Sequence, residues 1–247
     1  MKKAIWSLVI VILLFWGVQS TYADKGRQHY EEAGQILWEI RTDEKVIALT
    51  FDDGPHRKYT EEILDVLKEH NANATFFVVG VNVDKNPELV SRMSDEGHEI
   101  ANHTYTHDRS MKTSEVIKEM RKTNDTIQAI TGHPTTLFRP VEGYYTDDLV
   151  RAVSKEGYKL VMWSWHLDTL DWKNPGVDKI VNFVVDGAKE GNVVLFHDGG
   201  GNRRQTVDAL KEILPELKKE GYRFVSISEL MKIQETHHQE RQINETK

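Results

Sequence analysis

Acidic and imidazole side chains recur along this chain at spacings that suit metal-assisted hydrolysis. Two adjacent carboxylates, Asp52 and Asp53, follow a β-prone run and precede the turn Gly54-Pro55. Further along, His103 and His107 are four residues apart, a spacing that lets two imidazoles converge on one ion. Alone, the first pair is more often an acidic turn and the second a pair of surface histidines. Together they favour a metal site with two nitrogens, one carboxylate oxygen and an open position for water.

The two carboxylates need a rigid element behind them, and the run Val46–Phe51 is predicted to be a buried strand. Adjacent residues of a strand point to opposite faces, so Asp52 and Asp53 can serve different partners. Carboxylates at the end of an internal strand are costly to bury unless positive charge neutralises them. The sequence therefore predicts a cation, a basic side chain or both at this strand end.

The rest of the chain alternates strands with helices, which predicts a parallel sheet with helices outside it. We expect a short strand at 36–40 that turns into the central strand, and further strands at 74–79, 99–102, 135–139, 159–163, 192–196 and 222–225. Helices are expected at 60–70, 87–96, 113–131, 147–155, 177–188 and 204–219, with a last short one from 228. About seven such units favour an α/β fold of the distorted (β/α) barrel type. In such barrels the functional residues lie where strands end and loops begin.

Other chemically distinctive residues fall at these predicted strand ends. Arg139 ends the fourth strand, Asp171 and Trp172 follow the fifth, and His197 ends the sixth. Because the carboxyl ends of parallel strands meet at one rim, we expect these side chains to gather there with the Asp and His pairs.

The two ends of the chain are expected to lie outside the catalytic domain. Residues 1–23 have a basic start, an apolar stretch and small residues at the end, which predicts a signal peptide cleaved after Ala23. The alternative is a retained membrane anchor, although the apolar stretch is shorter than the about 20 residues that a span needs. We expect a loose lead-in at 24–42, one domain at 43–233 and a polar tail at 234–247.

Composition excludes several classes of function. The chain has no cysteine, so disulfides, thiolate metal sites and cysteine nucleophiles are all excluded. The net charge is −7, whereas nucleic-acid binding proteins usually carry a basic face. We therefore expect a secreted or cell-wall-associated monomer that binds no nucleic acid and meets a membrane only if its N-terminal segment is retained.

Five ordered motifs resemble those of the NodB-like polysaccharide deacetylases, carbohydrate esterase family 4, which include bacterial peptidoglycan N-acetylglucosamine deacetylases. The motifs are Thr50–Pro55, His103–His107, Arg139–Gly143, Asp168–Trp172 and Leu195–Asp198. The resemblance runs from about residue 43 to residue 233, which is essentially the whole predicted domain.

The resemblance implies how the metal and the attacking water are handled. Asp53, His103 and His107 would hold one divalent ion, zinc or alternatively cobalt or another metal, which activates the acetamide carbonyl and a water molecule. Asp52 would be the general base, and Arg139 would pair with Asp52 and orient it.

The resemblance also implies how the leaving group and the acetyl group are handled. His197 would be the general acid, with Asp171 fixing its tautomer. Trp172 and Leu195 would wall the pocket for the acetyl methyl group, and the backbone N–H of Glu142 would help to stabilise the oxyanion.

The third motif departs from the family pattern. The usual Arg-Pro-Pro-Tyr/Gly-Gly is replaced by Arg139-Pro-Val-Glu-Gly143 here. Loss of the second proline should loosen this loop, and the carboxylate of Glu142 should lie near the edge of the substrate. We expect activity to survive and sugar preference to change. Asp198 is expected to point away from the pocket, because adjacent strand residues face opposite sides.

The leading hypothesis is a secreted, metal-dependent N-deacetylase that removes acetate from N-acetylglucosamine or N-acetylmuramic acid residues of peptidoglycan. The alternatives are an O-acetyl esterase acting on xylan, a chitin-oligosaccharide deacetylase, and a catalytically silent glycan-binding wall protein. The intact acid, base and metal ligands argue against the silent protein.

Overall fold

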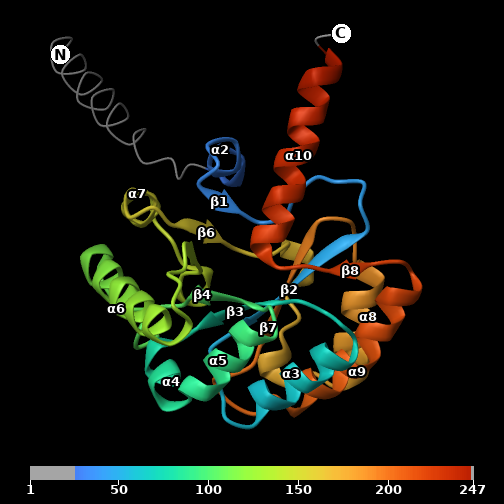
Figure 1. Cartoon of the computed structure of the whole chain (residues 1–247), viewed down its shortest axis with the longest axis horizontal. Coiled ribbons are helices and arrows are strands. Elements are labelled where there is room, and N and C mark those ends of the chain that lie inside the picture. The colour runs from blue at the N-terminus through green and yellow to red at the C-terminus, as the bar shows by residue number, and fades with distance from the viewer. Residues whose placement is uncertain (1–25, 246–247) are drawn as a thin grey trace, which may run out of the picture.

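The computed structural model describes residues 26–245, so the predicted signal peptide lies outside the described residues. Within this part an eight-stranded sheet has the order β1-β6-β5-β4-β3-β2-β7, with β8 beside β2 (Figure 1). All of its pairings are parallel. The strands are β1 (Ile36–Leu37), β2 (Val46–Asp52), β3 (Thr75–Val78), β4 (Glu99–Asn102), β5 (Leu137–Phe138), β6 (Lys159–Val161), β7 (Asn192–His197) and β8 (Arg223–Phe224). This half-barrel confirms the predicted fold class.

Helices surround the strands, with α3, α8 and α9 on one side and α6 and α7 on the other (Figure 1). The helices are α2 (Arg27–Glu32), α3 (Tyr59–Glu69), α4 (Gly80–Lys85), α5 (Pro87–Asp95), α6 (Thr113–Thr131), α7 (Asp147–Lys155), α8 (Val177–Gly187), α9 (Arg204–Lys219) and α10 (Ile227–Glu245). Apolar residues at helical spacing, such as Ile63, Leu64 and Leu67 of α3, are fully buried against the sheet. The short helix α4, which no pattern in the sequence predicts, begins two residues after β3.

The central strand β2 is buried on both faces, and its alternation decides where the carboxylates go. Ile47, Leu49 and Phe51 belong to the core beneath α3 and α9, while Val46 and Ala48 belong to the second core inside the half-barrel. Side chains alternate along a strand, so Thr50 and Asp52 share the inner face with Val46 and Ala48. The fold therefore directs Asp52 into the half-barrel at the carboxyl end of its central strand.

The chain after β6 returns along β7 and closes part of the gap between the ends of the sheet. The N–H of Ser164 donates to the carbonyl of Val193 at 2.9 Å, and Asp168 forms a parallel bridge with Leu195. The loop that carries Asp171 is thereby held beside the end of β7, where His197 lies.

The lead-in is more ordered than predicted. Residues Arg27–Glu32 form α2, whose Tyr30 is buried in the inner core. One buried aromatic ring anchors an otherwise polar turn of helix, and a single residue gives no periodicity to detect. The predicted strand at 36–40 shortens to β1, which pairs with β6 and not with β2.

The last helix is longer than the short one predicted from 228, because α10 continues to Glu245 through the segment predicted as a polar tail. Its first turns are anchored by buried Ile227 and Leu230, and the helix then projects beyond the sheet (Figure 1). The later turns have no apolar face, which is why the sequence pattern predicts only a short helix. Within the described residues, no helix has the length and apolarity needed to cross a membrane.

Candidate metal and catalytic site

Asp53, His103 and His107 meet at the carboxyl ends of β2 and β4. One ligand atom from each lies within 4.8 Å of the other two. Oδ1 of Asp53 is 3.0 Å from Nε2 of His107 and 3.6 Å from Nε2 of His103. Asp53 and His107 have positive φ angles of 75° and 61°, a backbone conformation that non-glycine residues rarely adopt and that marks functional positions. The structure thus brings the three predicted ligands together.

The environment of the histidines fits a divalent metal ion. Nδ1 of His103 lies 2.7 Å from the carbonyl oxygen of Arg139, so the ring donates there and leaves the Nε2 lone pair for a ligand bond. Burial lowers the pKa of His103 despite the nearby Asp52 and Asp53, which favours the neutral form that binds metal. Burial opposes ionisation of Asp53, but the hydrogen bond from His107 and the nearby imidazoles outweigh it and lower the pKa of Asp53.

Asp52 is held by a buried arginine. Nη1 of Arg139 donates to Oδ1 of Asp52 at 2.7 Å and to Oγ1 of Thr50 at 2.9 Å. The other guanidinium nitrogens of Arg139 donate to the carbonyls of Val161 and Met162. A buried ion pair is tolerated when its hydrogen bonds are satisfied in this way. The second oxygen of Asp52 is left facing the metal ligands, 3.8 Å from Nε2 of His103.

His197 and Asp171 form a second coupled pair across the site. Nδ1 of His197 lies 2.7 Å from Oδ1 of Asp171, whose Oδ2 accepts from the N–H of His197 and from Oγ1 of Thr206. Burial disfavours the imidazolium, but the hydrogen bond and charge of Asp171 outweigh burial and raise the pKa of His197 to about 9. The imidazole is thus protonated at neutral pH and can donate a proton from Nε2.

Asp198 faces away from this pair. Its carboxylate is buried and accepts a hydrogen bond from Oγ1 of Thr60 in α3 at 2.5 Å. Burial raises the pKa of Asp198 to about 7, with Thr60 opposing that rise. The predicted orientation of Asp198 therefore agrees with its contacts, and Thr60 lies in the first turn of α3.

We expect Asp171→Asn to move the alkaline limb of the pH–rate profile to lower pH. The pKa of His197 is raised, so its proton-donating form is present below about pH 9 and is lost as the pH rises through that value. Asparagine removes the charge that raises this pKa, while burial continues to lower it. Initial rates of acetate release across the neutral and alkaline range measure the limb.

The matched control is Asp198→Asn, which removes a neighbouring carboxylate that has no contact with His197 among the described hydrogen bonds. This variant should leave the alkaline limb in place. A shift in the Asp198 variant alone would assign the orienting role to Asp198. Absence of a shift in both variants would show that His197 is not the acid.

The remaining predicted residues lie around the mouth of the site. Leu195 is buried in the inner core, whereas Trp172 is half exposed in the loop after β6. Glu142 has a positive φ of 53°, and its carboxylate forms an ion pair with Nη1 of Arg109 at 2.6 Å. This ion pair joins the loop after β4 to the loop after β5.

Sequence reasoning missed several residues that hold the site. Thr50 accepts from Arg139, Thr206 donates to Asp171, and Nδ2 of Asn82 donates to the carbonyl of Asp53 at 2.9 Å. Asn82 and Thr206 lie in helices outside the motifs. Of these three residues, only Thr50 could have been identified from the sequence, because strand alternation places it on the same face as Asp52.

Two glycines let the loops after β2 and β7 approach closely. A Cβ atom at Gly199 would lie 2.1 Å from the carbonyl oxygen of Asp53, and one at Gly54 would lie 2.0 Å from the carboxylate of Asp198. Neither position has room for a side chain. The close contact fixes the backbone of Asp53, a candidate metal ligand, against the end of β7.

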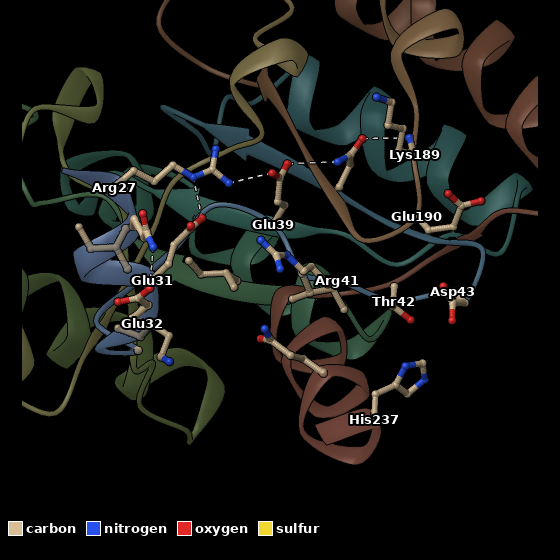
Figure 2. A pocket seen from close by; sticks show the side chains of 18 of the residues that line it. Arg27, Glu31, Glu32, Glu39, Arg41, Thr42, Asp43, Lys189, Glu190 and His237 are labelled. Atoms are coloured by element: carbon tan, nitrogen blue, oxygen red, sulfur yellow. Dashed lines mark hydrogen bonds and ion pairs between the residues drawn. The ribbon is translucent and has the colours of Figure 1, made fainter. Parts of the chain in front are cut away.

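A large cavity of about 1530 Å³ lies away from this site. Its lining includes α2, the segment before β2, the start of β7 and His237 of α10, and none of the predicted site residues (Figure 2). Arg27 pairs there with Glu31 and Glu39, and Glu39 in turn accepts from Asn192 (Figure 2). These contacts join α2 to the segment before β2 and to the start of β7.

Comparison with known proteins shows the family to which the chain belongs. The family model for polysaccharide deacetylase matches residues 39–161. The chain belongs to this family, the carbohydrate esterase family 4 hydrolases that cleave amide bonds.

Individual relatives are similar over most of the domain. A peptidoglycan-N-acetylglucosamine deacetylase from Bacillus cereus is 48% identical, over 83% of this chain and 97% of the relative. The peptidoglycan-N-acetylmuramic acid deacetylase PdaA from Bacillus subtilis is 38% identical, over 77% and 73%. A peptidoglycan N-acetylglucosamine deacetylase solved with a naphthalenyl benzamide superimposes with a TM-score of 0.78 at 34% identity, covering 82% of this chain and 95% of that one.

Proposed function

We propose that this protein is a secreted, metal-dependent deacetylase that hydrolyses the acetamide of N-acetylglucosamine residues in peptidoglycan and releases acetate. The observation that carries the proposal is the combination of the Asp53-His103-His107 cluster with a carboxylate oriented by Arg139 and an imidazole paired with Asp171. The relatives named for peptidoglycan support this choice of polymer, and the relative with 48% identity is named for N-acetylglucosamine.

Asp53, His103 and His107 would hold the metal, which when bound supplies a Lewis acid for the acetamide carbonyl and for a water molecule. Zinc suits this donor set, as do cobalt and other divalent ions. The lone pair of His103 is already directed toward Asp53 by the hydrogen bond to the carbonyl of Arg139.

Asp52 takes the proton of the attacking water in this proposal. Arg139 fixes one of its oxygens and leaves the other toward the metal ligands, so the base is oriented before substrate binds. His197 then donates its Nε2 proton to the departing amine, because an amide nitrogen leaves poorly as an anion. Asp171 keeps His197 protonated and holds its ring.

Three further groups would receive the acetyl group. Trp172 and Leu195 provide apolar surface for its methyl group, and the backbone N–H of Glu142 donates to the developing oxyanion. The left-handed conformation of Glu142 sets the direction of that N–H. The side chain of residue 142 is not needed for this contact, so the atypical third motif is compatible with activity.

Mass spectrometry of muropeptides from purified wall treated with the protein tests the proposal. We expect N-acetylglucosamine residues to lose acetyl groups, with equivalent release of acetate that a chelator abolishes. Loss from N-acetylmuramic acid would reassign the sugar. Release of acetate from acetylated xylan without any free amine on peptidoglycan would identify an O-acetyl esterase, and binding without acetate release would identify a silent glycan-binding protein.

A further inference from the structure

A second pocket of about 390 Å³ lies beside the metal cluster. Its volume falls within the about 300–1,000 Å³ usual for ligand sites. It opens between the loop that carries the metal-ligand histidines, which contributes Thr104, and the loop of the third motif, which contributes Pro140 and Val141. A substrate whose acetamide lies at the metal cluster would therefore place an adjacent part of itself at this pocket.

The pocket has an apolar floor and a charged rim. Its floor contains Met111, Val116, Phe138, Val141 and Leu149, and its rim carries Arg109, Lys112, Asp108 and Asp148. The two rim carboxylates are engaged locally, because Asp108 accepts from Ser110 and Asp148 pairs with Arg151.

The two rim cations differ in how they are engaged. Arg109 is paired with Glu142 at 2.6 Å, whereas no ion pair among the described residues involves Lys112. The guanidinium of Arg109 lies over the exposed ring of Tyr144, 5.6 Å from its centroid. Lys112 is therefore the rim group most open to an anion, with Arg109 beside it.

The ion pair between Arg109 and Glu142 separates the charges at this edge of the site. Arg109 lines the pocket and Glu142 does not. Within this pair, the guanidinium therefore lies at the pocket and the carboxylate lies outside its lining.

We propose that this pocket binds a carboxylate carried by the sugar next to the one that is deacetylated. The inference rests on the proposed function, because peptidoglycan alternates N-acetylglucosamine with a sugar that bears a lactyl group. The carboxylate is either that of a bare lactyl group or that of a peptide attached to it. Lys112 and Arg109 bind the anion, and the apolar floor contacts the methyl groups beside it.

The test compares three substrates: a neutral oligomer of N-acetylglucosamine, wall glycan with bare lactyl carboxylates, and wall glycan with intact peptides. The preference for acidic glycan is the kcat/KM on acidic glycan divided by the kcat/KM on the neutral oligomer. We expect Lys112→Gln to lower this ratio by about tenfold, because one charge-assisted hydrogen bond to the carboxylate is lost. Arg109→Gln should lower the same ratio. A drop confined to the bare glycan identifies the lactyl carboxylate, and a drop confined to the peptide-bearing glycan identifies a peptide carboxylate.

Lys118→Gln is the matched control, because Lys118 is exposed on α6, the helix that Lys112 caps, and does not line the pocket. This variant should leave the ratio unchanged, and thermal melting checks that all three variants fold. The proposal is overturned if Lys112→Gln and Arg109→Gln change the ratio no more than Lys118→Gln does.

Failure of the proposed function gives a different result. In that case neither the unaltered protein nor the Lys112→Gln variant would deacetylate either wall glycan. Calorimetric titration of acidic glycan into the unaltered protein and into the Lys112→Gln variant still tests the pocket. Equal affinities would overturn the proposal that the pocket binds a carboxylate. An affinity about tenfold lower in the variant would support that proposal.

Discussion

Asp52→Asn is expected to lower the turnover of acetylated substrate by about two to four orders of magnitude, the usual contribution of a positioned general base. Asparagine is nearly isosteric and retains an oxygen that can accept the hydrogen bond from Arg139, now made by Asp52 at 2.7 Å. It cannot accept the proton of the attacking water. Acetate release measures the loss, and metal analysis should show that the ion is retained.

The control for this variant is Asp178→Asn, which removes an exposed carboxylate from the start of α8. Its turnover should equal that of the unaltered protein. Thermal unfolding of the Asp52 variant separates lost chemistry from lost structure, because the buried Arg139 loses its neutralising partner. Near-normal turnover of Asp52→Asn would move the base elsewhere, and Glu142 would be the next candidate.

Replacement of both His103 and His107 by alanine is expected to abolish stoichiometric metal binding. Two of the three clustered donors are then lost, and one carboxylate cannot hold zinc or cobalt against water. Calorimetric titration of the metal-free protein with each ion measures the stoichiometry without any assay of activity.

The paired control replaces His237 and His238, two adjacent histidines of α10 that lie outside the metal cluster. His237 contacts Glu44 at 3.1 Å, which is a simple surface ion pair when the histidine is protonated. The control protein should bind one ion with unchanged affinity. One-to-one binding by the His103 and His107 variant would refute the assigned ligands.

The fold was predictable wherever burial left a pattern in the sequence. The strand ending at Asp52 stands out as an uninterrupted β-prone run, and the helix over 204–219 stands out because its apolar residues recur at helical spacing. Elements without such a pattern were missed. The helix α2 depends on the single buried ring of Tyr30, and the later turns of α10 contact too little of the protein to need an apolar face.

The candidate site was predictable as a set of residues, because each motif ends a strand and parallel strands share one rim. Its supporting contacts were not, since they depend on distances between elements far apart in the chain. Thr206 reaches Asp171 across 35 positions, and Arg109 reaches Glu142 from another loop. A short polar residue in a helix gives no sign in the sequence of such a partner.

Arg139 contacts the two halves of the site with two different parts of itself. Its carbonyl oxygen sets the ring of His103, and its guanidinium sets the carboxylate of Asp52. Because the carbonyl belongs to the backbone, it survives any substitution that leaves the loop in place. Under the proposed function, metal binding and hydrolysis would therefore depend on different parts of one residue. Loss of the Asp52 carboxylate in a descendant would remove the proposed base and leave the His103 ring oriented by the backbone of residue 139.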